Sequence, residues 1–243
     1  MTALRCTSSA RCRRNKVRQV VGQVDVIESV DRRELLADIN AEAAKRGTLL
    51  SFHEEEPSLV PSPGVNYGSE AAEHFGVPGA MASAESAMIG RDIALALDTG
   101  ARVLFQHVSS AQSVALIRAG KALGAHIYAE VTPHHLSLTE DAVPAHGTYA
   151  RMNPPLRKEA DRQALIAALA DGTIDMVATD HAPHTAEEKA REFAKAPSGI
   201  TGLETAFSVC NTYLGPDRKA HADAAARPYE QGSCRDLRSD RPC

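Results

Sequence analysis

Ionisable side chains stand where three apolar segments of the sequence end. The segment TLLSFH ends at His53, ARVLFQH ends at His107, and TIDMVATD ends at Asp180. Imidazole nitrogens and carboxylate oxygens are the ligands of catalytic zinc sites, which keep an open position for water. A metal ion lowers the pKa of such a water, and a nearby Asp can accept its proton. If the three residues meet, they predict metal-assisted hydrolysis.

Other candidate ligands are weaker. In TPHHL, His134 and His135 are adjacent on what we interpret as an extended segment, so their side chains should point to opposite faces. At least one of them is then a packing residue or contacts a ligand residue without binding the metal itself. In HEEEP, an acidic metal patch is an alternative, but we favour a solvated loop for Glu55 and Glu56. The histidines in polar or helical contexts are expected at the surface; they are His74, His126, His146 and His221.

The segment RMNPPLR carries a rigid amide and a cation. Its two prolines restrict the backbone around Asn153 and Arg157. A fixed amide beside a guanidinium would suit a polar, carboxylated substrate. An ordinary loop before the next helix, with Arg157 in solvent, explains the segment equally well, and the sequence leaves both interpretations open.

The elements that must position these residues alternate between helix and strand. Apolar positions spaced as on one helical face, such as Leu35, Leu36, Ile39 and Ala43, predict helices at RELLADINAEAAKRG, ASAESAMIGRDIALALDTG, AQSVALIRAGKALG and KEADRQALIAALADG. Ser109 or Ser110 can cap the third of these helices. The short apolar segments between them, with AHIYAEV, predict buried parallel strands. The carboxyl ends of such strands share one rim, where active residues gather, so His53, His107 and Asp180 should converge.

Composition and the two ends of the sequence set limits. The chain has 243 residues, a net charge of −4 and no apolar run near the roughly 20 residues of a membrane span, so we expect no nucleic-acid or membrane partner. Its five cysteines form no CxxC pair, which favours the reducing cytoplasm.

We divide the chain into a well-patterned domain at 33–214 and two atypical ends, 1–32 and 215–243, that are expected to be disordered.

Several motifs together resemble the dihydroorotases of the cyclic amidohydrolase superfamily. They are HEEEPSL, RDIALALDTGARVLFQHVSS, AEVTPHHLSLT, MNPPLR, ATDHAPHTAEEK and APSGITGLET, and they cover roughly residues 33–214. The resemblance implies an α/β fold, the (β/α)₈ TIM barrel of metal-dependent hydrolases. It also implies reversible hydrolysis of dihydroorotate to N-carbamoyl-aspartate in de novo pyrimidine biosynthesis.

The same resemblance assigns roles to residues. His53 and His107 would be zinc ligands, and Asp180 would bind zinc and serve as general base and acid, passing a proton to the leaving ring nitrogen. Asn153, His184 and the backbone of Ser198 and Gly199 would hold the substrate, with His184 facing its carboxylate. Family members often have a larger residue where Ser198 stands, which makes that contact less secure.

The sequence also departs from the family pattern. It contains no His-x-His pair, nothing before His53 resembles the family's strands one to four, and its last residues replace the closing helices. We therefore expect about strands five to eight of a barrel, at most one weakly bound zinc ion, and impaired activity.

Two other functions stay open. One is another cyclic amidohydrolase activity, such as that of a hydantoinase. The other is an inactive homologue that acts as a scaffold for aspartate carbamoyltransferase. Independently of the function, a homodimer would be one way to complete a partial barrel.

Overall fold

A four-stranded parallel sheet with helices on one face forms the body of the protein, in a computed structural model. The structure describes Thr7–Ser8, Val17, Val26–Ile27 and residues 33–214. Disorder predicted for 1–32 and 215–243 therefore falls almost wholly outside the described residues. The sheet has the order β3-β4-β5-β6. Its strands are β3 (Leu49–Phe52), β4 (Arg102–Phe105), β5 (Ile127–Val131) and β6 (Met176–Val177).

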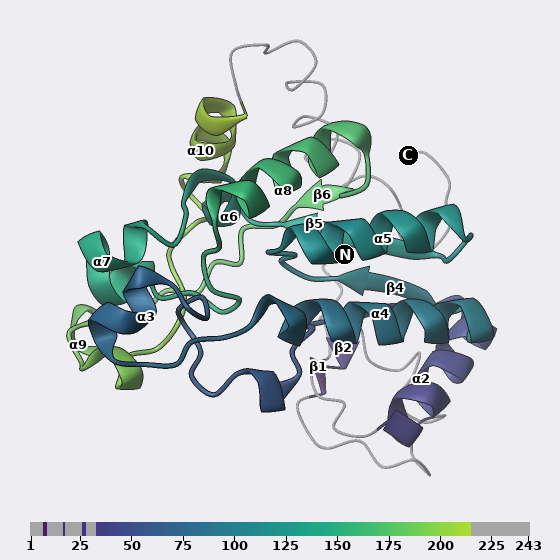
Figure 1. The fold of residues 1–243 in the computed structure, drawn as a ribbon. Coiled ribbons are helices and arrows are strands. Elements are labelled where there is room, and N and C mark those ends of the chain that lie inside the picture. Colours follow the sequence, from purple (N-terminus) through teal and green to yellow (C-terminus); the bar gives the residue numbers. More distant parts are fainter. Residues whose placement is uncertain (1–6, 9–16, 18–25, 28–32, 215–243) are drawn as a thin grey trace, which may run out of the picture.

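The helices fall into a group along the sheet and a group beyond its strand ends. Along the sheet run α2 (Arg33–Arg46), α4 (Ala82–Thr99), α5 (Ala111–Ala122) and α8 (Glu159–Asp171). Beyond the carboxyl ends of the strands lie α3 (Glu70–Phe75), α7 (Ala142–His146) and α9 (Ala186–Lys189) (Figure 1). The remaining elements are α6 (Pro133–Ser137), α10 (Ala206–Tyr213), the 3₁₀ turns η2 (Pro57–Leu59), η3 (Gly147–Ala150) and η4 (Phe193–Lys195), and the paired strands β1 (Thr7–Ser8) and β2 (Val26–Ile27).

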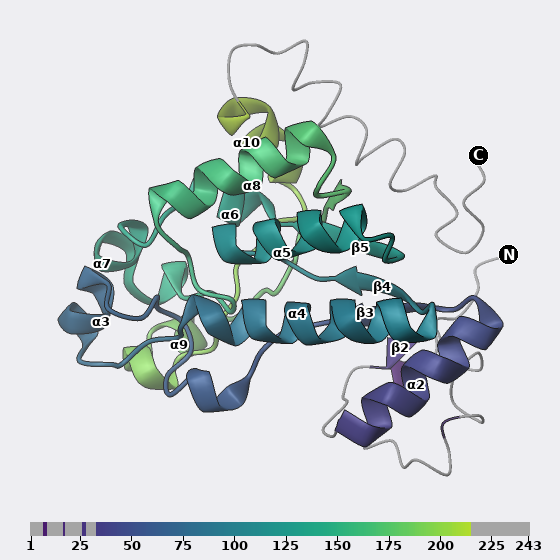
Figure 2. The same ribbon diagram turned by 45° about the vertical axis from the view of Figure 1, so that its right-hand side comes forward.

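The four predicted helices are confirmed, with ends set by local chemistry. Ser110 caps α5 by accepting a hydrogen bond from the backbone N–H of Ser113. Gly100 and Gly172 end α4 and α8 in the left-handed backbone region, with φ of 70° and 80°, which glycine adopts without steric cost. In Figure 2, α4, α5 and α8 run side by side across the sheet.

Burial of alternate strand residues joins the sheet to these helices. In-register neighbours Leu50, Val103 and Ile127 are all buried and belong to one apolar core. The predicted helical stripe of α2 packs into the same core through Leu35, Ile39 and Ala43. Leu36 was part of that predicted stripe, and its side chain lies outside the described part of the structure.

The last strand is shorter than its sequence indicates. Only Met176–Val177 of TIDMVATD forms β6, although Asp175 and Ala178 still donate backbone hydrogen bonds to Ala129 and Val131 of β5. The chain then leaves the extended conformation, and Asp180 has a φ of 44°. His107 beyond β4 has a φ of 36°. Left-handed backbone at residues other than glycine costs energy and is concentrated at functional sites.

Candidate functional site

Two histidines from neighbouring strands meet at the rim of the sheet. His53 directly follows β3, and His107 lies two residues beyond β4. Since β3 and β4 pair in parallel and in register, both side chains leave from the same end of the sheet. The Nδ1 atom of His53 lies 2.8 Å from the Nε2 atom of His107. The predicted convergence of these two residues is thus present in the structure.

The two rings differ in burial, and burial sets the protonation state of His107. His107 is 8% exposed, whereas the His53 side chain is 38% exposed. Burial, together with the nearby His53, lowers the pKa of His107 to about 3. His107 is consequently a neutral imidazole at pH 7, the form that can offer a lone pair to a metal ion.

The carboxylate of Glu55 contacts the exposed side of the His53 ring. Its Oε2 atom lies 3.5 Å from His53 Nε2 and accepts a 2.9 Å hydrogen bond from Asn153 Nδ2. The hydrogen bond with His53, aided by the one with Asn153, lowers the pKa of Glu55 despite its partial burial. The predicted loop is present at Glu55, but its carboxylate is only partly exposed, because it contacts the ring of His53. Residues two apart in an extended segment point to the same side, so the spacing of His53 and Glu55 is compatible with this contact.

Asn153 keeps one polar atom without a protein partner. Its amide nitrogen is committed to Glu55, while its Oδ1 atom is buried and accepts no hydrogen bond among the described residues. A buried amide oxygen of this kind needs a partner, and the N–H of a bound molecule can supply one.

Asp180 stands at the same rim as the histidines. Partial burial raises the pKa of its carboxyl group, and interaction with His53 opposes that rise. Burial also raises the pKa of Glu130 on β5 to about 7, against a hydrogen bond from the backbone of His107, with a further rise from Asp180. The rim therefore combines the neutral imidazole of His107 with carboxyl groups whose proton affinity is increased, a common setting for acid–base chemistry.

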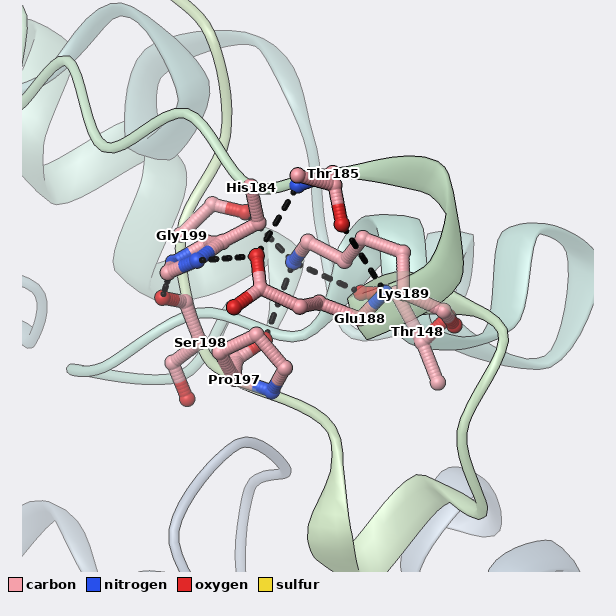
Figure 3. A network of polar contacts seen from close by, with 8 residues as sticks. All are labelled: Thr148, His184, Thr185, Glu188, Lys189, Pro197, Ser198 and Gly199. Atoms are coloured by element: carbon pink, nitrogen blue, oxygen red, sulfur yellow. Dashed lines mark hydrogen bonds and ion pairs between the residues drawn. The ribbon is translucent and has the colours of Figure 1, made fainter.

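His184, Ser198 and Gly199 form a separate group around α9 (Figure 3). His184 Nε2 lies 2.9 Å from the carbonyl oxygen of Ser198, so this nitrogen carries the proton. The other ring nitrogen lies 3.7 Å from Glu188 Oε2. The structure thus brings together three of the four residues expected to hold the substrate, whereas Asn153 lies at the rim with Glu55.

The residues present fit part of a metal site. Two nitrogens bound to one tetrahedral zinc ion lie about 3.3 Å apart, given Zn–N bonds of about 2.0–2.1 Å. The 2.8 Å between His53 and His107 is close to that spacing. Within the part of the chain that the structure describes, no three His, Cys, Asp or Glu side chains are grouped so that they could hold a metal ion. The described residues therefore fit two positions of a metal site.

The expectation for the adjacent histidines was wrong about their backbone. His134 and His135 lie in the short helix α6, with Thr132 as N-cap and Pro133 in the first turn. Both are buried, and their ring centroids are 4.6 Å apart. Thr followed by Pro is a helix-start signal, so the sequence did contain the information. His135 Nε2 donates to the carbonyl oxygen of Pro154, which makes His135 a support of the loop that carries Asn153.

The predicted loop before the next helix is present, but Arg157 does not lie in solvent, and its guanidinium group is bound within the protein. Its side chain is 4% exposed, and Nη1 donates 2.7 Å hydrogen bonds to Asn66 Oδ1 and to the carbonyl oxygen of Ala80. Nε donates to Ser109 Oγ at 3.3 Å. Arg157 therefore joins three distant segments, and its partners are fixed by tertiary structure that a local motif does not specify.

Curated proteins similar to this chain are dihydroorotases. The chain is 53% identical over 180 residues to the dihydroorotase of Clostridioides difficile, covering 74% of this chain and 42% of that protein. It is also 53% identical over 165 residues to the dihydroorotase of Clostridium acetobutylicum, covering 68% of this chain and 39% of that protein. The chain thus spans about two fifths of the length of these relatives.

Solved structures agree on the fold. A D-hydantoinase from Thermus sp. superposes with a TM-score of 0.69 at 25% identity, covering 82% of this chain and 45% of that one. A Saccharomyces cerevisiae dihydroorotase in complex with 5-fluoroorotic acid gives a TM-score of 0.69 at 18% identity, covering 93% and 64%. No family model matches the chain. The four-stranded parallel sheet with its helices is therefore part of a TIM barrel of the amidohydrolase type.

Proposed function

Since this chain belongs with the dihydroorotases in the cyclic amidohydrolase superfamily, we propose that its site serves the reversible hydrolysis of dihydroorotate to N-carbamoyl-aspartate. This reaction would place it in pyrimidine biosynthesis. We further propose that residues 33–214 form the amidohydrolase unit. The observation that carries the proposal is the 2.8 Å approach of His53 and His107 in a chain 53% identical to dihydroorotases.

The residues at the rim have distinct roles in the proposed reaction. The rings of His53 and His107 would hold a zinc ion, with Asp180 as a further ligand. When bound, zinc would polarise the ring amide and activate water. Asp180 would accept a proton and return it to the leaving ring nitrogen, and the raised pKa of its carboxyl group supports that role.

The substrate would lie between the rim and the α9 group. The unpartnered Oδ1 atom of Asn153 suits a ring N–H of dihydroorotate. His184 and the backbone of Ser198 and Gly199 would hold the substrate at its other side. To donate an N–H to the substrate carboxylate, His184 must carry a proton on Nδ1 or release the Ser198 carbonyl, because Nε2 is already committed.

The described residues supply an incomplete donor set, so we expect weak metal binding and slow turnover by the 243 residues alone. The test measures zinc content and dihydroorotate hydrolysis of the purified chain beside its Asp180→Ala variant. Zinc-dependent turnover that is lost at least a hundredfold in Asp180→Ala supports the proposal. Turnover that is equal in both proteins overturns the role of Asp180.

Two alternatives are decided by the same preparation. The hydantoinase fold match makes hydantoin the comparison substrate, and faster turnover of hydantoin than of dihydroorotate would favour that activity. The incomplete donor set would also fit an inactive scaffold. Absence of zinc and turnover together with binding to aspartate carbamoyltransferase would favour the scaffold, and a change of mass on sizing would reveal a homodimer.

A further inference from the structure

Lys189 is a buried lysine whose ammonium group binds three carbonyl oxygens. The residue ends α9 and is 4% exposed. Its Nζ atom donates hydrogen bonds to the carbonyl oxygens of Thr148 at 3.1 Å, Pro197 at 3.0 Å and Gly199 at 2.6 Å (Figure 3). An ammonium group has three N–H donors, so all three are used.

These bonds fix a turn between two other parts of the chain. Thr148 Oγ1 donates a hydrogen bond back to the carbonyl oxygen of Lys189, which closes a reciprocal link between η3 and α9. On the far side of the turn, the backbone N–H of Gly199 donates to the carbonyl oxygen of Arg151 at 2.9 Å. Gly199 has a φ of 130°, and a Cβ atom there would lie 2.7 Å from Ala182 Cβ. The backbone at 197–199 therefore has little freedom to move.

The fixed backbone at 197–199 also orients the ring of His184. The carbonyl of Ser198, which accepts from His184 Nε2, lies between the two carbonyls of Pro197 and Gly199 that Lys189 holds. On the other side of the ring stands Glu188, whose Oε2 atom also accepts from the backbone N–H of Thr185 at 3.0 Å. If Lys189 released its carbonyls, one buried and two partly buried acceptors would lose their donor, and the Ser198 carbonyl would lose its fixed position.

We propose that Lys189 is a positioning residue, which sets the Ser198 carbonyl and so fixes the ring of His184 for substrate binding. The link to substrate rests on the proposed function, whereas the effect on the His184 ring does not. Lys189 does not contact substrate itself, because all three N–H donors of its ammonium group are bound to carbonyl oxygens. Its role is to hold the binding group in one orientation before substrate arrives, which lowers the entropy lost on binding.

The test compares Lys189→Met with Lys195→Met in the full chain. Methionine keeps most of the apolar stem and removes the ammonium group. Lys195 is the matched control, because it lies on the same connecting segment but is exposed and pairs with Glu192 at the surface. The first readout is the NMR signal of the His184 Nε2–H proton, assigned by its loss in His184→Gln. The second is hydrogen exchange of the Gly199 amide, with the Ala178 amide in the sheet as reference.

In Lys189→Met we expect the NMR signal of the His184 ring proton to disappear. Hydrogen exchange of the Gly199 amide should be at least tenfold faster, while exchange of the Ala178 amide stays unchanged. Lys195→Met should match the unmodified chain in both readouts. A retained ring signal and unchanged Gly199 exchange in Lys189→Met would overturn the inference. If Lys189→Met does not fold, Lys189→Gln, which keeps two N–H donors, should show the same losses to a smaller degree, and their absence there would overturn it equally.

Kinetics separate positioning from general stability. For Lys189→Met we expect the KM for dihydroorotate to rise about tenfold and kcat to change less than threefold. A lower kcat at unchanged KM would mean a smaller folded fraction and would contradict a positioning role. If the unmodified chain turns over no dihydroorotate, the proposed function fails, and the ring signal and amide exchange still decide the role of Lys189.

Discussion

At the scale of single residues, the chemistry of the site depends on which nitrogen of His53 carries a proton. Glu55 is an anionic carboxylate, because its pKa is lowered by its hydrogen bonds with His53 and Asn153. A carboxylate beside Nε2 stabilises a proton there and leaves a lone pair on Nδ1, which faces His107. Carboxylate partners of this kind orient metal-binding histidines and increase their basicity.

Replacing Glu55 with Gln should therefore weaken metal binding. We expect the dissociation constant for Zn²⁺ to rise about 10–100-fold, which is the usual effect of removing such a partner. A competition titration with a chromophoric chelator measures it. Glu56→Gln is the control, since the neighbouring Glu56 caps η2 through an oxygen that Gln retains. Equal Zn²⁺ affinity in Glu55→Gln and the unmodified chain would show that Glu55 does not orient His53.

At the scale of elements, the close packing of α4 against α5 depends on a glycine. A Cβ atom at Gly120 in α5 would lie 2.9 Å from Ile93 Cγ2 of α4 and 2.9 Å from Ile127 Cδ1 of β5, and both isoleucines are buried. Gly90 on α4 is different, because a Cβ atom there would meet only Leu116 Cδ1, at an ordinary 3.8 Å. The two positions therefore separate packing from helix propensity.

Opposite effects on stability follow for the two Gly→Ala changes. Alanine improves helix propensity by up to about 1 kcal/mol at either position. At Gly120, overpacking of the core costs about 1–3 kcal/mol and should exceed that gain. We expect Gly120→Ala to lower the free energy of unfolding by about 1 kcal/mol and Gly90→Ala to raise it by up to about 1 kcal/mol, as measured by urea denaturation. Stabilisation by both changes would mean that the α4–α5 contact is looser than its distances indicate.

The elements were predictable where local sequence determines them. Helix periodicity and a terminal glycine located α4 and α8, and continuous apolar segments located β3, β4 and β5. The meeting of His53 and His107 followed from the parallel order, because it needs only adjacent strand ends. Burial of Arg157 did not follow, since its partners Asn66 and Ala80 lie far from it in the sequence.

For the molecule as a whole, buried neutral histidines couple stability to pH. Burial lowers the pKa of His107 to about 3, that of His134 to about 4, and that of His135 well below its usual value. Burial also raises the pKa of Glu130 to about 7. Among the described residues, no helix is both long and apolar enough to cross a membrane.

The sign of the pH dependence follows from proton uptake. Below the ordinary histidine pKa of about 6.5, the unfolded chain binds a proton at each of the three histidines while the folded chain does not, so acid favours unfolding. Glu130 acts in the opposite direction: between about pH 4.5 and 7 the folded chain holds a proton that the unfolded chain releases. Glu54 acts in the same direction as Glu130, because burial also raises the pKa of its carboxyl group well above the ordinary value. Three protons against two still leave unfolding favoured as the pH falls from about 6.5 to 4.5.

We therefore expect the metal-free chain to lose about 1 kcal/mol of folding free energy between pH 6 and pH 5, from a net uptake of about one proton on unfolding at about 1.4 kcal/mol per proton and pH unit. Urea denaturation in the presence of a chelator measures this loss. His134→Gln should remove most of it, because one neutral histidine no longer has to be charged on unfolding. His126→Gln is the control, since His126 is exposed, and it should leave the loss unchanged. Equal folding free energy at the two pH values would mean that water reaches the buried histidines and lets them bind protons in the folded state.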